Sequence, residues 1–163
     1  MKKILQILLC ICVFALVTDC SFAQKKSPSI SLTLASEKYE FSAGAEIVIG
    51  LKTTNLTKKL ISFKGSNTGN VDSTMLYEVF DEGGNPLAKK THPHMELDAS
   101  SPVEFSINPG DTDDSYVTIS DMFPFNLPGT YVVRLSRYDP VLTDRDGNKV
   151  IVTSNPITIT ISE

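Results

Sequence analysis

The sequence predicts an all-β protein built as a two-sheet antiparallel sandwich of eight or nine short strands. Apolar residues recur at every second position in several segments, and residues that favour turns separate these segments. Because successive side chains of a strand point to opposite faces, this alternation buries one face and leaves the other in water. No long stretch after the N-terminal region shows the apolar spacing of an amphipathic helix. Short strands in series without helices favour a sandwich over an α/β fold.

The first residues predict export. Met1–Lys3 carries two lysines, and a mainly apolar run from Ile4 to Val17 follows it. This run is shorter than the roughly 20 residues that a membrane-spanning helix needs, and the layout is that of a bacterial secretory signal peptide. The small residues of Ser21-Phe22-Ala23 suit a signal peptidase. We therefore expect a signal peptide at residues 1–23, with cleavage between Ala23 and Gln24, and a secreted or periplasmic protein.

Cys20 offers an alternative to free secretion. It follows Val17-Thr18-Asp19, which resembles a lipoprotein motif, although Asp19 departs from the small uncharged residue that this motif has before the cysteine. Lipidation of Cys20 would attach the protein to a membrane. Without lipidation, no membrane contact is expected. All three cysteines lie in the signal segment, so the mature chain is expected to have no disulfide and to depend on its hydrophobic core.

The mature chain reads as one domain. Residues 24–29 are predicted to be a flexible lead-in and residues 30–163 to form the sandwich. Alternation predicts strands at 30–34, 47–51, 131–135 and 157–161, and further strands are expected at 60–64, 74–81, 103–107, 116–119 and 149–153. Turn chemistry separates them at 42–44, 82–86, 108–111, 127–129 and 146–148. Residues 92–102 are expected to be a loop that crosses between the sheets.

The segment Phe125–Val133 carries the most specific local pattern. It resembles the tyrosine corner of immunoglobulin-like and fibronectin-like sandwiches, with Tyr131 as the corner tyrosine and Pro128-Gly129 as the bend. The resemblance implies that the Tyr131 hydroxyl bonds back to the chain a few residues upstream. Val133 stands where antibody domains have a cysteine, and the chain has no tryptophan. The order of strands and turns is similar to immunoglobulin-like domains of secreted bacterial proteins, with a fainter likeness to bacterial proteinase-inhibitor domains.

The only two histidines suggest a metal site. An extended chain would place His92, His94, Glu96 and Asp98 on one face, and imidazole and carboxylate groups are suitable ligands for zinc and similar metals. Pro93 interrupts the segment, and an alternating polar face is also typical of a solvated loop or edge strand. Metal binding by His92 and His94 is therefore an alternative hypothesis.

Three other segments have both a functional and a structural interpretation. Asp144–Asn148 resembles the start of a calcium loop without its later glutamate, or else forms a hairpin turn. Asp111–Asp114 could help to bind a cation, or is a solvated acidic turn. Met122–Phe125 could form an exposed apolar patch, or closes the open end of the sandwich. Asn55-Leu56-Thr57 also matches a glycosylation acceptor, which has no role in a typical bacterial protein.

The composition gives solubility without a specific partner. A formal net charge of −4 argues against nucleic acid as a ligand. No nucleophile elbow, phosphate-binding loop or dinucleotide fingerprint is present, so no cofactor and no catalysis are expected. We expect a secreted, non-catalytic immunoglobulin-like module that binds a protein or a glycan through its loops. The alternatives are a proteinase inhibitor that inserts residues 64–73 or 92–102 into an enzyme, and a metal-binding protein or metal-dependent enzyme that uses His92 and His94.

Overall fold

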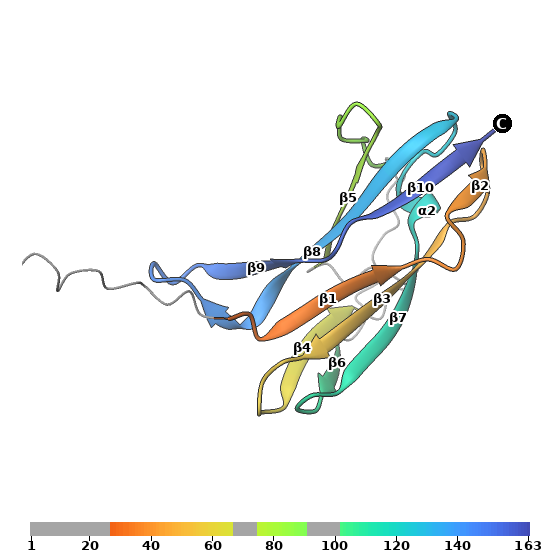
Figure 1. The fold of residues 1–163 in the computed structure, drawn as a ribbon. Coiled ribbons are helices and arrows are strands. Elements are labelled where there is room, and N and C mark those ends of the chain that lie inside the picture. The colour runs from red at the N-terminus through yellow and green to blue at the C-terminus, as the bar shows by residue number, and fades with distance from the viewer. Residues whose placement is uncertain (1–26, 67–74, 91–101) are drawn as a thin grey trace, which may run out of the picture.

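The computed structural model describes residues 27–66, 75–90 and 102–163, and these form a strand-rich fold with one short helix (Figure 1). The elements in chain order are β1 (Ile30–Ala35), β2 (Glu40–Ser42), β3 (Val48–Asn55), β4 (Ile61–Ser66), β5 (Met75–Phe80), β6 (Pro102–Ile107), β7 (Thr112–Thr118), α2 (Ile119–Met122), β8 (Gly129–Thr143), β9 (Lys149–Thr153) and β10 (Ile157–Ser162). The all-β class predicted from the sequence is confirmed.

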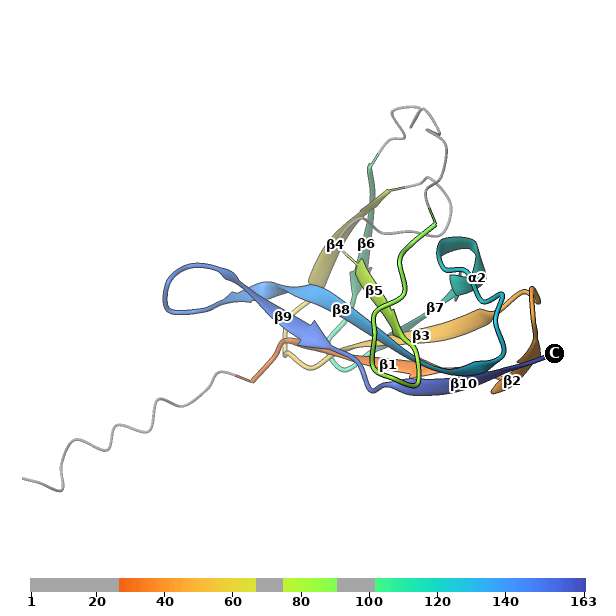
Figure 2. The same ribbon diagram turned by 90° about the horizontal axis from the view of Figure 1, so that it is seen from above.

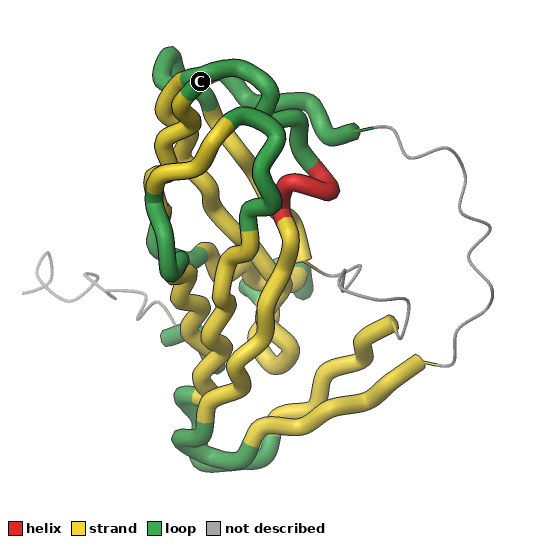
Figure 3. Tube along the Cα trace, turned by 90° about the vertical axis from the view of Figure 1, so that its right-hand side faces the viewer, coloured by secondary structure: helices red, strands yellow, loops and turns green. Residues whose placement is uncertain are grey.

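The described strands form three sheets where the sequence predicted two. The first sheet has the order β1-β3-β7 and is antiparallel. The second has the order β2-β10-β8-β5, and β9 pairs with the far part of β8. The third is the pair β4-β6, which stands apart from the other strands in Figure 3. Ten strands replace the expected eight or nine, and β2 pairs with β10 in parallel rather than antiparallel.

β2 is the strand that the sequence did not predict, and β8 is longer than predicted. β2 has only three residues, so no alternation marks it in the sequence. β8 was predicted to end at Leu135 but continues to Thr143. The prediction ended too early because the buried positions in the second half of the strand are polar or charged. Arg137 and Asp139 are both buried there, and a sequence pattern reads such residues as exposed.

The two larger sheets enclose the hydrophobic core, and the hairpin of β8 and β9 projects beyond the other strands (Figure 2). The inward faces of β1, β3 and β7 contribute Leu32, Ile49 and Val117. The facing sheet contributes Val133 and Ile159, both fully buried. The inward positions alternate with outward ones along β10 without exception, as expected for a strand with one face in water.

The third sheet is attached to the second through stacked side chains. Phe63 of β4 and Phe105 of β6 stack with their ring centroids 4.9 Å apart. The guanidinium of Arg137 on β8 lies 4.0 Å from the centroid of the Phe63 ring. A buried arginine over an aromatic face gains cation–π attraction that is stronger than in water. This contact helps to stabilise a charged residue in the interior of β8.

Asn55, at the end of β3, is a fully buried polar junction. Its side-chain nitrogen donates to the carbonyl oxygens of Lys59 and Ile107, at 2.8 and 2.9 Å. Its side-chain oxygen accepts from the amide and hydroxyl of Thr57, both at 2.8 Å. Its backbone pairs with the turn before β7, through the carbonyl of Asp111 and the amide of Gly110. The residue therefore joins β3 to the β4–β6 pair and to the start of β7.

The chain enters the fold at Ser29, one residue before the predicted boundary. Ser29 is buried, and its amide and hydroxyl donate to the carboxylate of Asp139 at 2.7 and 2.5 Å. The amides of Val141 and Leu142 donate to the same carboxylate. Burial alone would raise the pKa of Asp139, but the hydrogen bonds from Ser29, Leu142 and Val141 outweigh it and lower the pKa. Ser29 therefore belongs to the domain and not to a flexible lead-in.

The predicted signal peptide, the cleavage point at Ala23 and Gln24, and the lipidation site at Cys20 all lie outside the described residues, so they stay predictions. Within the described ranges, no helix has both the length and the apolar character that crossing a membrane requires.

Replacing Asn55 tests the polar junction. We expect Asn55→Ala to lower the free energy of unfolding by about 2–4 kcal/mol, because buried carbonyl and amide groups lose their partners. Thr112→Ala, at an exposed position of the neighbouring strand, should change it by less than about 0.5 kcal/mol. Urea denaturation followed by circular dichroism measures both. Equal stability of the two variants would contradict the assignment.

The lowered pKa of Asp139 predicts how stability depends on pH. Its folded-state pKa lies below the unfolded value of about 3.9, so its contribution is fully present above about pH 4 and is lost as the pH falls through the folded pKa. Asp139→Asn should lower stability at neutral pH by about 1.5–3 kcal/mol and flatten the acid side of the stability curve. Asp146→Asn, in an exposed turn, is the matched control. Parallel pH profiles for wild type and Asp139→Asn would refute this role.

Candidate functional site

A groove of about 930 Å³ runs along the outer face of the first sheet. Its floor is formed by outward positions of β1, β3 and β7, and its wall by residues 36–46, the chain that leaves β1, forms β2 and returns to β3. Ligand-binding clefts in proteins typically have volumes of about 300–1,000 Å³. The groove is therefore large enough for an organic ligand of several rings.

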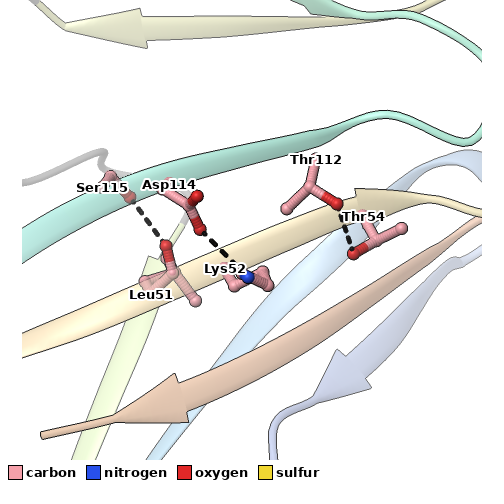
Figure 4. Close-up of polar contacts among 6 residues, drawn as sticks. All are labelled: Leu51, Lys52, Thr54, Thr112, Asp114 and Ser115. Carbon is pink, nitrogen blue, oxygen red and sulfur yellow. Dashed lines mark hydrogen bonds and ion pairs between the residues drawn. The ribbon is translucent and has the colours of Figure 1, made fainter.

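The floor of the groove consists of two cross-strand rows, and a third row continues the same face. Strand register places Thr33, Lys52 and Asp114 in one row and Ala35, Gly50 and Tyr116 in the next. In the first row, Lys52 and Asp114 form an ion pair at 3.7 Å across β3 and β7 (Figure 4). In the third row, the hydroxyls of Thr54 and Thr112 are 3.1 Å apart. Most side chains on this face are small or polar.

Tyr116 is the one large aromatic side chain on this floor. It is 69% exposed although it lies in the middle of a paired strand. A methyl group placed on Gly50 would lie 3.7 Å from the Tyr116 ring, so the ring extends across the space that Gly50 leaves open. Neighbouring strands commonly cover a glycine with an aromatic ring in this way. The groove thus has a flat aromatic surface that water contacts.

Charged side chains surround this aromatic surface. Glu37, Lys38, Glu40 and Glu46 line the wall, and all four are exposed. The wall itself is fixed by backbone hydrogen bonds to β10, from Thr160 to Tyr39 and from Ala43 to Ser162, at 2.7 and 2.9 Å. The charged groups are therefore carried by a segment that the second sheet holds in place.

A second hollow, of about 330 Å³, adjoins the groove. Ala45 and Glu46 line both hollows, and Lys90, Ser120 and Asp121 line the second one. The Lys90 ammonium donates to the carbonyl of Ser120 at 2.6 Å, and the Lys90 amide donates to the carbonyl of Met122 at 2.7 Å. These two bonds attach residues 87–90 to α2.

The structure places Tyr131 where the sequence pattern expects a corner tyrosine. Its hydroxyl donates to the carbonyl of Leu127 at 2.9 Å, four residues upstream. Its ring meets Phe125 edge to face, with the centroids 5.3 Å apart. Pro128 and Gly129 form the bend between them, and Gly129 has a φ of 153°. This cluster has a structural role, and its Phe125 also lines the second hollow.

The metal hypothesis falls on residues that are not described. His92, His94, Glu96 and Asp98 all lie between 91 and 101, so their arrangement is untested and metal binding by them stays a prediction. Among the residues that are described, no group of three or more His, Cys, Asp or Glu side chains could hold a metal ion.

Asp144–Asn148 forms the hairpin turn between β8 and β9. The Asp144 carboxylate accepts from the amides of Asn148 and Asp146, and Gly147 has a φ of 84°. Hydrogen bonds from the side chain and backbone of Asn148 lower the pKa of Asp144. The turn Asp81–Asn85 repeats this arrangement, with Asn85 bonding to Asp81 and Gly84 at a φ of 78°. The common sequence Asp-X-X-Gly-Asn therefore encodes a turn here.

The remaining candidates also have structural roles. Met122, Phe123 and Phe125 are buried in the core, so they form no exposed patch. Asp111 accepts a side-chain bond from Asn108 in the turn before β7. Both side-chain amide hydrogens of Asn55 have protein acceptors, which leaves this buried nitrogen inaccessible as a glycosylation acceptor in the folded protein.

Sequence reasoning missed the groove. Its aromatic floor depends on Tyr116 lying opposite Gly50, and this pairing follows from strand register rather than from any local motif. The strand expected at 116–119 matches only the end of β7, which begins at Thr112, and Ile119 instead begins α2. Nothing in the sequence pattern assigned the partner of this strand. The one available signal was an outward aromatic residue in a strand whose other outward positions are polar.

Comparison with known proteins gives no family assignment. No family model and no curated protein matches the chain. Among solved structures, the CARDB domain of the PF1109 protein from Pyrococcus furiosus, crystallised in complex with di-metal ions, is similar with a TM-score of 0.43 and 9% identity, over 85% of this chain and 96% of that one. BslA, a bacterial hydrophobin, is similar with a TM-score of 0.36 and 14% identity, over 85% and 99% of the two chains. Neither similarity is close enough to transfer a function.

Proposed function

We propose that this protein is an exported, non-catalytic binding module of the immunoglobulin-like sandwich class, and that it binds a glycan in the groove on the β1-β3-β7 sheet. The exposed Tyr116 ring over Gly50, inside a groove whose wall carries four charged side chains, is the observation that carries this proposal. Export rests on the N-terminal sequence pattern. The immunoglobulin-like class is supported by two sheets around one core and by the Tyr131 corner.

The chemistry of the groove favours a sugar chain over a protein partner. A pyranose ring has an apolar C–H face that packs on an aromatic ring, and hydroxyls at its edge that bond to polar groups. Tyr116 supplies such a ring, and the hydroxyls and carboxylates of the groove supply acceptors and donors. Protein interfaces instead concentrate several large apolar or arginine side chains at their centre. Tyr116 is the one aromatic ring on this floor, and its apolar neighbours there, Val48 and Ala35, are smaller.

The sequence predicted binding through loops, and the proposal places it on a sheet face beside a connecting segment. The inhibitor alternative depends on residues 64–73 or 92–102, most of which are not described, and no observation in the described part favours it. Calorimetric titration of the purified protein with neutral and amine-bearing oligosaccharides tests the proposal. Absence of binding to every oligosaccharide at millimolar concentration would contradict it.

Tyr116→Ala is the decisive variant. Loss of the stacking ring should weaken oligosaccharide binding by about twofold to tenfold, because a stacking contact of an aromatic ring contributes about 0.5–1.5 kcal/mol beyond the surface it buries. Tyr138→Ala is the matched control, because Tyr138 is 41% exposed on β8, in the other sheet. Both variants should unfold at the wild-type urea concentration. Equal affinity of Tyr116→Ala and Tyr138→Ala would place the ligand elsewhere.

A further inference from the structure

The groove and the second hollow adjoin each other. Ala45 and Glu46, on the short connection that leads into β3, line both hollows. On one side of Glu46 lie Tyr116 and the Lys52–Asp114 pair, and on the other lie Asp121 and Lys90. An extended ligand that stacks on Tyr116 can therefore continue past Glu46 into the second hollow.

The charges along this path are mostly negative. Its carboxylates are Glu37, Glu40, Glu46, Asp114 and Asp121, and its ammonium groups are Lys38, Lys52 and Lys90. Lys52 is paired with Asp114, which balances one charge of each sign. The other four carboxylates, with Glu46 between the two hollows, outnumber the ammonium groups of Lys38 and Lys90. A positively charged ligand would complement this path, and Tyr116 would add cation–π attraction.

We propose that the ligand is an amine-bearing glycan chain that spans both hollows, with Glu46 contacting an ammonium group at their junction. This inference rests on the proposed glycan-binding function and specifies its substrate class. A protonated amino sugar combines the apolar ring face that Tyr116 accepts with the positive charge that the carboxylates attract. A neutral sugar would leave these carboxylates without charged partners.

Titration with oligomers of defined charge and length tests the inference. A glucosamine hexamer, its fully N-acetylated counterpart, a neutral glucose hexamer and a glucosamine dimer are each titrated at about pH 5.5, where carboxylates are ionised. We expect the glucosamine hexamer to bind most tightly and the dimer more weakly. Added salt should weaken hexamer binding, because exposed charges are screened. Equal affinity for charged and uncharged hexamers overturns the charge preference but leaves glycan binding intact.

Glu46→Gln tests the role of the Glu46 charge between the two hollows, because it removes the charge with little change in the shape of the side chain. It should weaken glucosamine hexamer binding about threefold to fivefold, the effect of one exposed ion pair, and leave binding of the acetylated hexamer unchanged. Glu82→Gln, in the exposed turn after β5, removes the same charge outside both hollows and should have no effect. Equal affinities of Glu46→Gln and Glu82→Gln for the glucosamine hexamer would show that Glu46 does not contact the ligand. A dimer that binds as tightly as the hexamer would refute a ligand that spans both hollows. If no hexamer of any charge binds, the proposed glycan-binding function itself fails.

Discussion

The buried amide of Asn55 sets the register on which the rest of the first sheet depends. It bonds to the chain before β4 and to the end of β6, while its backbone bonds to the turn that leads into β7. These contacts fix where β7 begins against β3, with Thr112 opposite Thr54. A slip of one residue would reverse the faces of every β7 side chain. Asp114 would then leave Lys52, Tyr116 would turn into the core, and the groove would lose its aromatic floor.

Much of the fold could be predicted because its strands alternate in the simplest way. Ile157, Ile159 and Ile161 are buried at every second position, and this pattern is readable without a structure. Tyr131 was also readable, because a corner depends on residues that are close in sequence. The third sheet, β2 and the second half of β8 were not readable. β2 is too short to show a pattern. The positions of the third sheet and of the second half of β8 depend on buried Asn55, Arg137 and Asp139, whose burial is offset by contacts with partners distant in sequence, such as Ser29, Phe63 and Ile107.

The candidate site was harder to predict than the fold for the same reason. The sequence draws attention to histidines and acidic turns, because those residues carry recognisable chemistry on their own. In the described turns, the acidic residues bond to neighbouring asparagines and amides and so complete the turn itself. The groove instead combines residues from β1, β3, β7 and the connecting wall, none of which is distinctive alone. Its character comes from the pairing of Gly50 with Tyr116, a property of the sheet.

The wall of the groove depends on the transfer of the chain from one sheet to the other. After β1 the chain leaves the first sheet, and β2 pairs in parallel with β10 in the second. Asn155 bonds to both the amide and the carbonyl of Leu34, so the outer edge of β1 is satisfied near the point of departure. Bonds from Thr160 and to Ser162 then hold the crossing segment on either side of β2. A wall fixed along its length loses little conformational freedom when a ligand binds, which lowers the entropic cost of association. The same crossing that interrupts the regular sandwich therefore turns an otherwise open sheet face into a groove with a fixed wall.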